Sequence, residues 1–131
     1  MKHEEHQIQC AIVDLLEVAL PADATFWAVP NGEKRGGKKI NVKGKLVPLS
    51  AIRLKKEGVK PGVADIHILW RGCLVCLEVK TGAGRQSKSQ KEWADAITTS
   101  GGVYHIVRSV DDARGFLAGL IPTFKAQGVA A

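Results

Sequence analysis

The first twenty residues alternate apolar and polar side chains with the period of an α-helix. The apolar positions recur at three- and four-residue spacing: Ile8, Ile12, Leu15, Leu16 and Ala19. Side chains at these spacings share one face of a helix, and Pro21 cannot continue the helix because proline lacks a backbone N–H. The pattern predicts an amphipathic helix over residues 4–20, with an apolar face that another element must cover.

Four short runs further along the chain are rich in β-branched and aromatic residues, which favour strands. Arg71 and Gly72 separate the second run from the third, and a two-residue break that contains glycine favours a β-hairpin. Helical patterns lie between and after these runs. Ser87 with Gln90, or Ser89 with Glu92, could form a capping box at the start of one, and Ser109 with Asp112 is placed to cap another. The predicted strands span residues 25–29, 64–70, 74–80 and 103–107, and the further helices span about 48–57, 87–100 and 109–120.

This order of elements predicts an α/β fold with a central mixed β-sheet flanked by helices, in the order αβββαβ. The strands 74–80 and 103–107 are joined by a helix, and such crossover units are right-handed with parallel strands. A chain of 131 residues, 45% of them hydrophobic, fits one domain over residues 1–131. We expect its core to lie within about residues 4–120, and the weakly patterned tail 121–131 to be frayed.

The positive charge of the chain is concentrated in an insertion over about residues 33–58. Ten of the 19 basic residues lie between positions 33 and 60, so this window is +8 while the rest of the chain is −2. Residues 33–45 contain glycines and few apolar side chains, which predicts a surface loop ahead of the short helix. Basic residues in such a loop neutralise DNA phosphates without reading bases. The predicted DNA-binding residues are Lys34, Arg35, Lys38, Lys39, Lys43 and Lys45.

Several protein classes do not fit the sequence. No stretch approaches the roughly eighteen apolar residues that cross a bilayer, so we expect a cytoplasmic protein that binds no membrane. Cys73 and Cys76 fall in a predicted strand, where positions three apart point to opposite faces, so they do not form a redox or zinc pair. Aromatic residues are few, and Trp27, Trp70 and Trp93 fall mostly at positions expected in the core, which argues against a stacking surface for single-stranded nucleic acid.

The predicted hairpin brings two carboxylates together. If the two residues after Trp70 form the turn, Asp65 lies opposite Glu78, and Lys80 follows on the same face. Like charges that oppose each other in a sheet are destabilising unless something compensates them. A divalent cation would do so, because Mg²⁺ and Mn²⁺ prefer carboxylate oxygens. The alternative is an ordinary surface ion pair between Glu78 and Lys80, with Asp65 merely ending a turn.

These residues also carry a resemblance to a known family. Asp65 followed after twelve residues by Glu78-Val79-Lys80 resembles the D…ExK signature of the PD-(D/E)xK nuclease superfamily, and the chain resembles a stand-alone VRR-NUC domain in particular. The family usually has proline before the metal-binding aspartate, where this chain has Ala64. Four further family motifs are matched in order, by Glu5-His6-Gln7-Ile8-Gln9, Pro30-Asn31-Gly32, the glycine-rich segment 58–66 and Ser89-Gln90.

The resemblance implies a restriction-endonuclease-like core and metal-dependent hydrolysis of phosphodiester bonds in DNA. By that resemblance, Asp65, Glu78 and the backbone carbonyl of Val79 would bind Mg²⁺ or Mn²⁺. Lys80 would hold or help deprotonate the attacking water and would stabilise charge in the transition state. Glu5 would complete the metal shell or serve a second ion, and Gln90 would orient water or a phosphate oxygen.

Some of these side chains also have an ordinary structural explanation. Glu5 and Gln9 suit the first turns of a helix, where an acidic residue interacts favourably with the helix dipole. Gln90 has the spacing of a capping box with the serine three residues before it. His67 shares the predicted face of the two carboxylates, and we expect a packed histidine there rather than a metal ligand.

The resemblance also bears on the substrate and the assembly. Stand-alone members of the family resemble Holliday junction resolvases and act as homodimers, so branched DNA, such as a four-way junction, and a homodimer are expected. The first alternative is a DNA- or RNA-binding module that has kept the fold without activity. The second is a purely structural or protein-interaction domain. An intact set of Asp65, Glu78 and Lys80 favours the enzyme, because a binding module has no need for opposed carboxylates.

Overall fold

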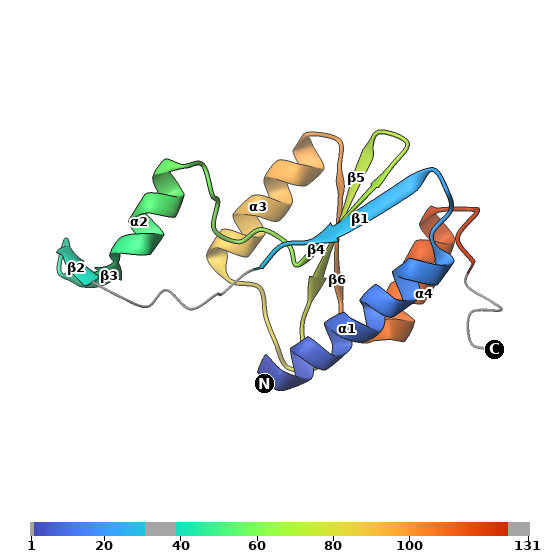
Figure 1. Cartoon of the computed structure of the whole chain (residues 1–131), viewed down its shortest axis with the longest axis horizontal. Coiled ribbons are helices and arrows are strands. Elements are labelled where there is room, and N and C mark those ends of the chain that lie inside the picture. Colours follow the sequence, from blue (N-terminus) through green and yellow to red (C-terminus); the bar gives the residue numbers. More distant parts are fainter. Residues whose placement is uncertain (1, 31–38, 126–131) are drawn as a thin grey trace.

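The computed structural model describes residues 2–30 and 39–125 (Figure 1). Apart from β2 and β3, every element lies where the sequence pattern predicts it, to within two residues at each end. No helix in these two ranges is long and apolar enough to span a bilayer. The elements are α1 (Lys2–Ala19), β1 (Ala24–Ala28), β2 (Lys39–Val42), β3 (Lys45–Pro48), α2 (Leu49–Lys56), β4 (Ile66–Trp70), β5 (Cys73–Val79), α3 (Lys88–Thr99), β6 (Val103–Val107) and α4 (Val110–Leu120).

The main sheet has four strands in the order β1-β4-β5-β6. β4 pairs antiparallel with β1 and β5, whereas β5 pairs parallel with β6, so the predicted mixed sheet is confirmed. The turn between β4 and β5 consists of Arg71 and Gly72, both at positive φ, as a tight type I′ hairpin turn requires. Trp70 therefore pairs with Cys73, which is the predicted register.

Helices cover both faces of this sheet. On one face, α1 and α4 pack their apolar sides against alternate strand residues, and Ile12, Leu16, Leu77 and Leu117 are fully buried there. On the other face, the Trp93 ring of α3 stacks on His67 of β4 with ring centroids 5.4 Å apart. Figure 1 shows α3 on one side of the sheet and α1 with α4 on the other.

β5 has a different character on its two faces. Val75, Leu77 and Val79 belong to the core beneath α1 and α4, while Cys76 and Glu78 point to the opposite face and are also buried. The period of two in a strand produces this division. It leaves a carboxyl group inside the protein, where burial is costly unless the group is neutralised or paired.

The prediction of an irregular loop over residues 33–45 is wrong in its second half. β2 and β3 form a separate two-stranded hairpin, joined by Lys43 and Gly44 at φ values of 50° and 85°. The Asn41 Oδ1 atom accepts a hydrogen bond of 3.0 Å from the Gly44 N–H and so supports the turn. The density of lysines hid this hairpin, because Lys-Gly is not the Asn-Gly or Asp-Gly pair that signals a type I′ turn.

The hairpin and α2 form an arm, defined here as residues 39–57. α2 packs on β3, and neither α2 nor the hairpin packs extensively on the main sheet. Figure 1 shows the arm standing to one side of the rest of the molecule. The arm carries six basic residues and one acidic residue, Glu57. It also exposes apolar side chains, among them Leu46 at 71%.

The C-terminal segment also departs from expectation. We predicted a frayed tail from Ile121 onward, but Ile121 is fully buried and Phe124 is 7% exposed in the core beneath α1 and α4. The Lys125 N–H donates to the carbonyl of Ala19 at 2.9 Å, which satisfies an acceptor at the end of α1. Residues 126–131 lie outside the described ranges.

Candidate active site

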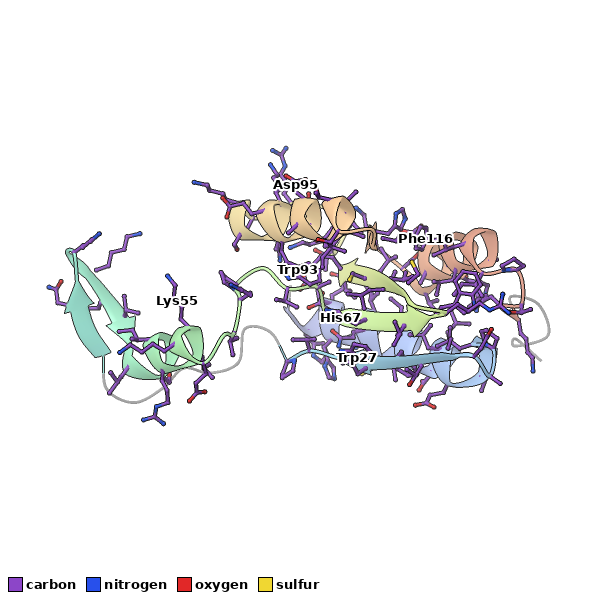
Figure 2. All side chains as sticks on the ribbon, turned by 90° about the horizontal axis from the view of Figure 1, so that it is seen from above. Trp27, Lys55, His67, Trp93, Asp95 and Phe116 are labelled. Atoms are coloured by element: carbon purple, nitrogen blue, oxygen red, sulfur yellow. The ribbon has the colours of Figure 1, made fainter. Side chains whose placement is uncertain are left out.

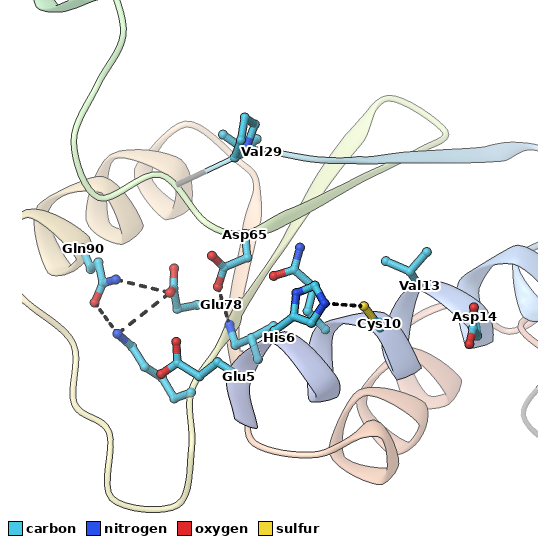
Figure 3. Close-up of a pocket in the computed structure, with 13 residues that line it drawn as sticks. Glu5, His6, Cys10, Val13, Asp14, Val29, Asp65, Glu78 and Gln90 are labelled. Carbon is cyan, nitrogen blue, oxygen red and sulfur yellow. Dashed lines mark hydrogen bonds and ion pairs between the residues drawn. The ribbon is translucent and has the colours of Figure 1, made fainter. Parts of the chain in front are cut away.

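A cavity of about 620 Å³ lies where the C-terminal end of β5 meets the N-terminal half of α1 (Figure 3). It collects side chains from α1, the segment before β4, β5 and α3, which lie far apart in the sequence. All of the residues predicted to be catalytic or metal-binding line it: Glu5, Asp65, Glu78, Val79, Lys80 and Gln90.

Asp65 is held at the cavity by backbone contacts on both sides. Its carbonyl accepts a hydrogen bond from the Val29 N–H at 2.8 Å, which extends the pairing of β1 with β4. Its Oδ2 atom accepts one from the Val79 N–H at 2.8 Å, across the top of β5. The carboxylate is therefore positioned by main-chain groups, which move less than side chains do.

Glu78 is the more unusual of the two acids because only 3% of the residue is exposed. Its Oε2 atom accepts a hydrogen bond from the Gln90 amide at 3.2 Å. Its Oε1 atom is buried and has no hydrogen-bond partner among the described residues. Burial, and next the negative charge of Asp65, raise the pKa of Glu78 to about 9, against the opposing effect of Lys80.

Lys80 lies next to both of these groups. Its Nζ atom donates to the Gln90 Oε1 atom at 2.8 Å and is 3.9 Å from the Glu78 Oε2 atom. Only 12% of its side chain is exposed, so this is not the surface ion pair that the sequence left open. The ammonium group is held inside the cavity rather than extended into solvent.

Gln90 combines two functions that sequence reasoning treated as alternatives. It is the third residue of the α3 capping box: its Oε1 atom accepts from the Ser87 N–H at 2.8 Å, and its own N–H donates to the Ser87 Oγ atom at 3.2 Å. The same amide binds Lys80 through Oε1 and Glu78 through Nε2. The start of α3 thus fixes the position of the Glu78 carboxyl relative to the Lys80 ammonium.

A close backbone contact brings the start of α3 next to the segment before Asp65. Gly62 has a φ of +79°, and a Cβ atom at this position would lie 2.3 Å from the backbone oxygen of Ser89. Only glycine fits such an approach. This close approach is the physical reason for glycine three residues before Asp65, and the sequence alone did not reveal it.

The loop that follows Lys80 is anchored as well. The Arg108 Nη1 atom donates to the carbonyl of Thr81 at 2.6 Å and to that of Gly84 at 2.9 Å. These bonds satisfy carbonyls between β5 and α3 and limit the freedom of that connection. We did not identify Arg108 from the sequence, because its partners are backbone atoms more than twenty positions away.

The N-terminal half of α1 forms the opposite wall. Glu5 and Gln9 line the cavity, and the charge of Glu5 adds slightly to the raised pKa of Glu78. His6 and Cys10 line it too, with the Cys10 Sγ atom 3.6 Å from the His6 ring (Figure 3). Sequence reasoning missed this pair, although the four-residue spacing places both on one side of a helix.

The other predicted residues fall elsewhere. Lys39, Lys43 and Lys45 lie on the β2–β3 hairpin of the arm, and the side chains of Lys43 and Lys45 do not line the cavity. The remaining predicted DNA-binding residues, Lys34, Arg35 and Lys38, are outside the described residues. His67 is 8% exposed beneath Trp93, as expected for a packed histidine, and burial lowers the pKa of its ring.

Of the three tryptophans that were expected mostly at core positions, Trp27 is the exception. Trp70 packs against the core and Trp93 stacks on His67, but Trp27 is 41% exposed. The sequence pattern placed Trp27 in a strand correctly. It did not reveal that this strand lies at the edge of the sheet, where α3 covers less of the face.

The donor set suits a divalent cation with few protein ligands. Among the described residues, no three His, Cys, Asp or Glu side chains are grouped closely enough to form a complete cage. Asp65 and Glu78 nevertheless offer two carboxyl groups at one cavity, and one oxygen of Glu78 is buried with no hydrogen-bond partner in the described part of the chain. Hard ions such as Mg²⁺ accept one or two carboxylates and complete their shell with water and substrate phosphate.

The raised pKa of Glu78 predicts how stability depends on pH without a divalent cation. Between its unfolded pKa of 4.5 and its folded pKa of about 9, the folded protein keeps a proton that the unfolded chain releases. The folded state binds more protons, so stability falls as pH rises through this window, by up to about 1 kcal/mol per pH unit. Thermal melts in a chelator should show that the melting temperature falls as the pH of the buffer is raised from about 6 to about 9.

Glu78→Gln should flatten this dependence, because an amide does not titrate. Glu17→Gln on the exposed side of α1 is the matched control and should leave the slope unchanged. Added Mg²⁺ or Mn²⁺ should raise the midpoint most at alkaline pH, where the carboxyl loses its proton most easily. If the melting temperature of the Glu78→Gln variant depended on pH as steeply as that of the parent, Glu78 would not be the group responsible.

Comparison with solved structures identifies the fold. A structure described as a VRR_NUC domain protein superposes on this chain with a TM-score of 0.67. The superposition covers 92% of this chain and 89% of the chain in that structure. The chain has a VRR-NUC fold. The predicted restriction-endonuclease-like architecture is therefore confirmed. The two sequences are 17% identical, and no family model and no curated protein matches the chain.

Proposed function

We propose that the protein is a metal-dependent nuclease that hydrolyses phosphodiester bonds in DNA. The observation that carries this proposal is the meeting of Asp65, Glu78 and Lys80 in one cavity of a VRR-NUC fold. A buried carboxyl group beside a second acid destabilises a protein, as the raised pKa of Glu78 indicates. Such perturbed groups cluster at catalytic sites, where the chemistry needs them.

In this proposal, Asp65, Glu78 and the Val79 backbone carbonyl hold Mg²⁺ or Mn²⁺, and Glu5 completes the shell or serves a second ion. When bound, the ion supplies Lewis-acid polarisation of a phosphate oxygen and lowers the pKa of water. The main-chain hydrogen bond from the Val79 N–H to the Asp65 Oδ2 atom keeps one carboxylate oriented before any ligand arrives. Preorganised ligands need no rearrangement during the reaction.

Lys80 is proposed to hold or help deprotonate the attacking water and to stabilise negative charge on the phosphate in the transition state. Its ammonium group has few water neighbours, so its field acts through a medium of low dielectric constant. We assign Gln90 a positioning role in addition to orienting water or a phosphate oxygen. Its amide holds the Lys80 ammonium on one side and the Glu78 carboxyl on the other.

The proposed substrate is DNA, with branched DNA such as a four-way junction favoured, and the proposed assembly is a homodimer. Support for a polyanionic partner comes from the arm, whose described residues carry six positive charges and one negative charge. The alternative is a DNA- or RNA-binding module without activity. The buried Glu78 carboxyl beside Asp65 argues against it, because carboxylates hinder phosphate binding by itself.

Cleavage of labelled DNA tests the proposal. Linear duplex, flap and four-way substrates of equal length are incubated with Mg²⁺, with Mn²⁺ or with a chelator, and the mass of the protein in solution is measured alongside. We expect metal-dependent products, with four-way or flap DNA cut faster than linear duplex. A protein that retards all three DNAs in a gel and cuts none would be a binding module.

Neutralising the arm should weaken DNA binding without changing the fold. Replacing Lys39, Lys43 and Lys45 by glutamine removes three charges from a hairpin that packs little on the sheet. Affinity at low salt should fall about tenfold or more, and the slope of log K against log salt should shrink by about 0.9 for each phosphate that the arm no longer neutralises. Fluorescence anisotropy over a salt series measures both quantities.

The matched control is the double substitution Arg71→Gln and Lys125→Gln. Arg71 lies at the opposite end of β4 from Asp65, and Lys125 lies beside Ala19, at the end of α1 away from Glu5. This change should leave the salt slope nearly unaltered. An equal fall in affinity in both variants would mean that the arm has no special role in holding DNA and that net charge alone explains binding.

A further inference from the structure

Trp27 places an exposed indole ring next to the proposed catalytic cavity. It lies on the edge strand β1 and pairs in register with His67 of β4. Two residues later, just past the end of β1, Val29 lines the cavity and donates its N–H to the carbonyl of Asp65 at 2.8 Å. A strand rises about 3.3 Å per residue, so Trp27 is about 7 Å along the chain from the cavity wall.

The indole is held by a row of rings. Trp27 meets His67 in a T-shaped contact at 5.7 Å, His67 stacks on Trp93 at 5.4 Å, and Trp93 meets Tyr104 in a second T-shaped contact at 6.0 Å. The Tyr104 hydroxyl accepts a hydrogen bond from the Gln86 amide at 3.2 Å. Figure 2 shows Trp27, His67 and Trp93 following one another from the edge of the sheet to α3.

Only the outer end of this row is open. His67 is 8% exposed, whereas Trp27 is 41% exposed on the face of the sheet opposite the main core. The core side of β1 is filled by its neighbour Phe26, so Trp27 is not needed there. Leu69 on β4 is 40% exposed as well, which indicates that α3 leaves this part of the face uncovered. A rigid aromatic ring in such a position is an anchor for a planar ligand.

The cavity beside Trp27 indicates the kind of ligand. Trp27 is two residues from Val29, which lines a cavity proposed to hold a phosphodiester next to the Lys80 ammonium. An aromatic ring next to a phosphate site that contains a cation suits an unpaired nucleotide, because the ring can stack on the base while the phosphate is held in the site. A base inside a continuous duplex is already stacked on both sides and offers no free ring face.

We propose that Trp27 stacks on an unpaired nucleobase beside the scissile phosphodiester and selects DNA with unpaired or splayed nucleotides over continuous duplex. This inference rests on the proposed nuclease function and refines its substrate class. Trp27 acts in substrate recognition and not in the chemical step. The row of rings behind it fixes the indole before DNA binds, so little side-chain freedom is lost on binding.

The test compares two DNAs of equal length, a duplex with a single-stranded flap and a blunt duplex. Affinity is measured by anisotropy in a Lys80→Ala background that is expected to bind without cutting. Trp27→Ala should weaken binding of flap DNA about tenfold and that of blunt duplex less than about twofold. Trp27→Tyr, which keeps a ring, should retain most of the discrimination, and flap DNA should quench indole fluorescence in the parent but not in Trp27→Tyr.

Two controls keep the outcome interpretable. Leu69→Ala, an exposed apolar residue on the same face, should leave both affinities unchanged. Trp27→Leu keeps apolar bulk without an aromatic ring and should behave as Trp27→Ala does, which covers the case in which the alanine variant is unstable. Equal losses for both DNAs, an effect of Leu69→Ala as large as that of Trp27→Ala, or a changed mass of the protein in solution would each overturn the proposal.

Cleavage by the protein with Lys80 intact separates the two levels of inference. If the parent and the Trp27 variants cut DNA with the same preference for flap over blunt duplex, the stacking role would be refuted and the nuclease function would be supported. Discrimination between the two DNAs that depends on Trp27, in a protein that cuts neither, would support stacking and refute the nuclease.

Discussion

Lys80→Ala is expected to lower the rate of DNA cleavage about 1,000-fold while DNA affinity changes only a few-fold. The Lys80 ammonium lies inside the cavity with 12% of the side chain exposed and is held by the Gln90 amide. Its proposed interaction strengthens as charge develops on the phosphate, so its loss should appear in kcat rather than in KM. Single-turnover cleavage of labelled four-way or flap DNA measures the effect.

The chain offers a matched control in Lys91→Ala. Lys91 is an exposed lysine on α3 next to Gln90, so it tests whether any positive charge near the site is sufficient. It should retain nearly full activity. Glu78→Gln should be as inactive as Lys80→Ala, and added Mn²⁺ should no longer stabilise it against heat. Normal cleavage by the Lys80→Ala variant would remove the ammonium from the mechanism.

Gly62→Ala is expected to cause the largest loss of stability among single-methyl changes, about 3 kcal/mol or more. The added Cβ atom would lie 2.3 Å from the Ser89 carbonyl oxygen and 2.7 Å from the Gln90 nitrogen, both of them backbone atoms that cannot rotate away. The φ of +79° adds strain for any residue with a side chain. Thermal and denaturant unfolding measure the loss.

Gly58→Ala is the matched control for this prediction. Gly58 also has a positive φ, of +97°, but a Cβ atom there meets nothing within 4 Å. It should cost only about 1 kcal/mol. Because Gly62 touches the segment that carries Gln90, Gly62→Ala should also reduce cleavage under conditions where the protein is still folded. Equal losses of stability in the two variants would mean that the close approach to α3 is unimportant.

The nearness of the two acids was predictable from the sequence because it depends on local rules. Side chains alternate along a strand, and a two-residue turn sets the register of the strands that it joins. Arg71 and Gly72 form that turn in the structure. Ile66 therefore pairs with Leu77, and Asp65 and Glu78 are the next residues outward from that pair. The capping serines of α3 and α4 were predictable for the same reason, since their partners are three residues away.

The arm and the C-terminal segment were predicted poorly for opposite reasons. The β2–β3 hairpin depends on Lys43 and Gly44 at positive φ, a local feature that was hidden among lysines. The burial of Ile121 and Phe124 depends on α1, which lies about a hundred positions earlier, because both side chains pack in the core that α1 covers. Local patterns reveal nothing about such a distant partner.

The sequence by itself determined which residues face one another along the strands, where the helices begin, and hence that Asp65, Glu78 and Lys80 share one side of a sheet. Only the tertiary structure decided which of these groups are buried. Glu78 has its raised pKa, Gln90 its two partners and Trp27 its 41% exposure because α3 covers one part of the sheet and not another. Alternation along a strand is a property of the local backbone, whereas burial depends on how distant elements pack.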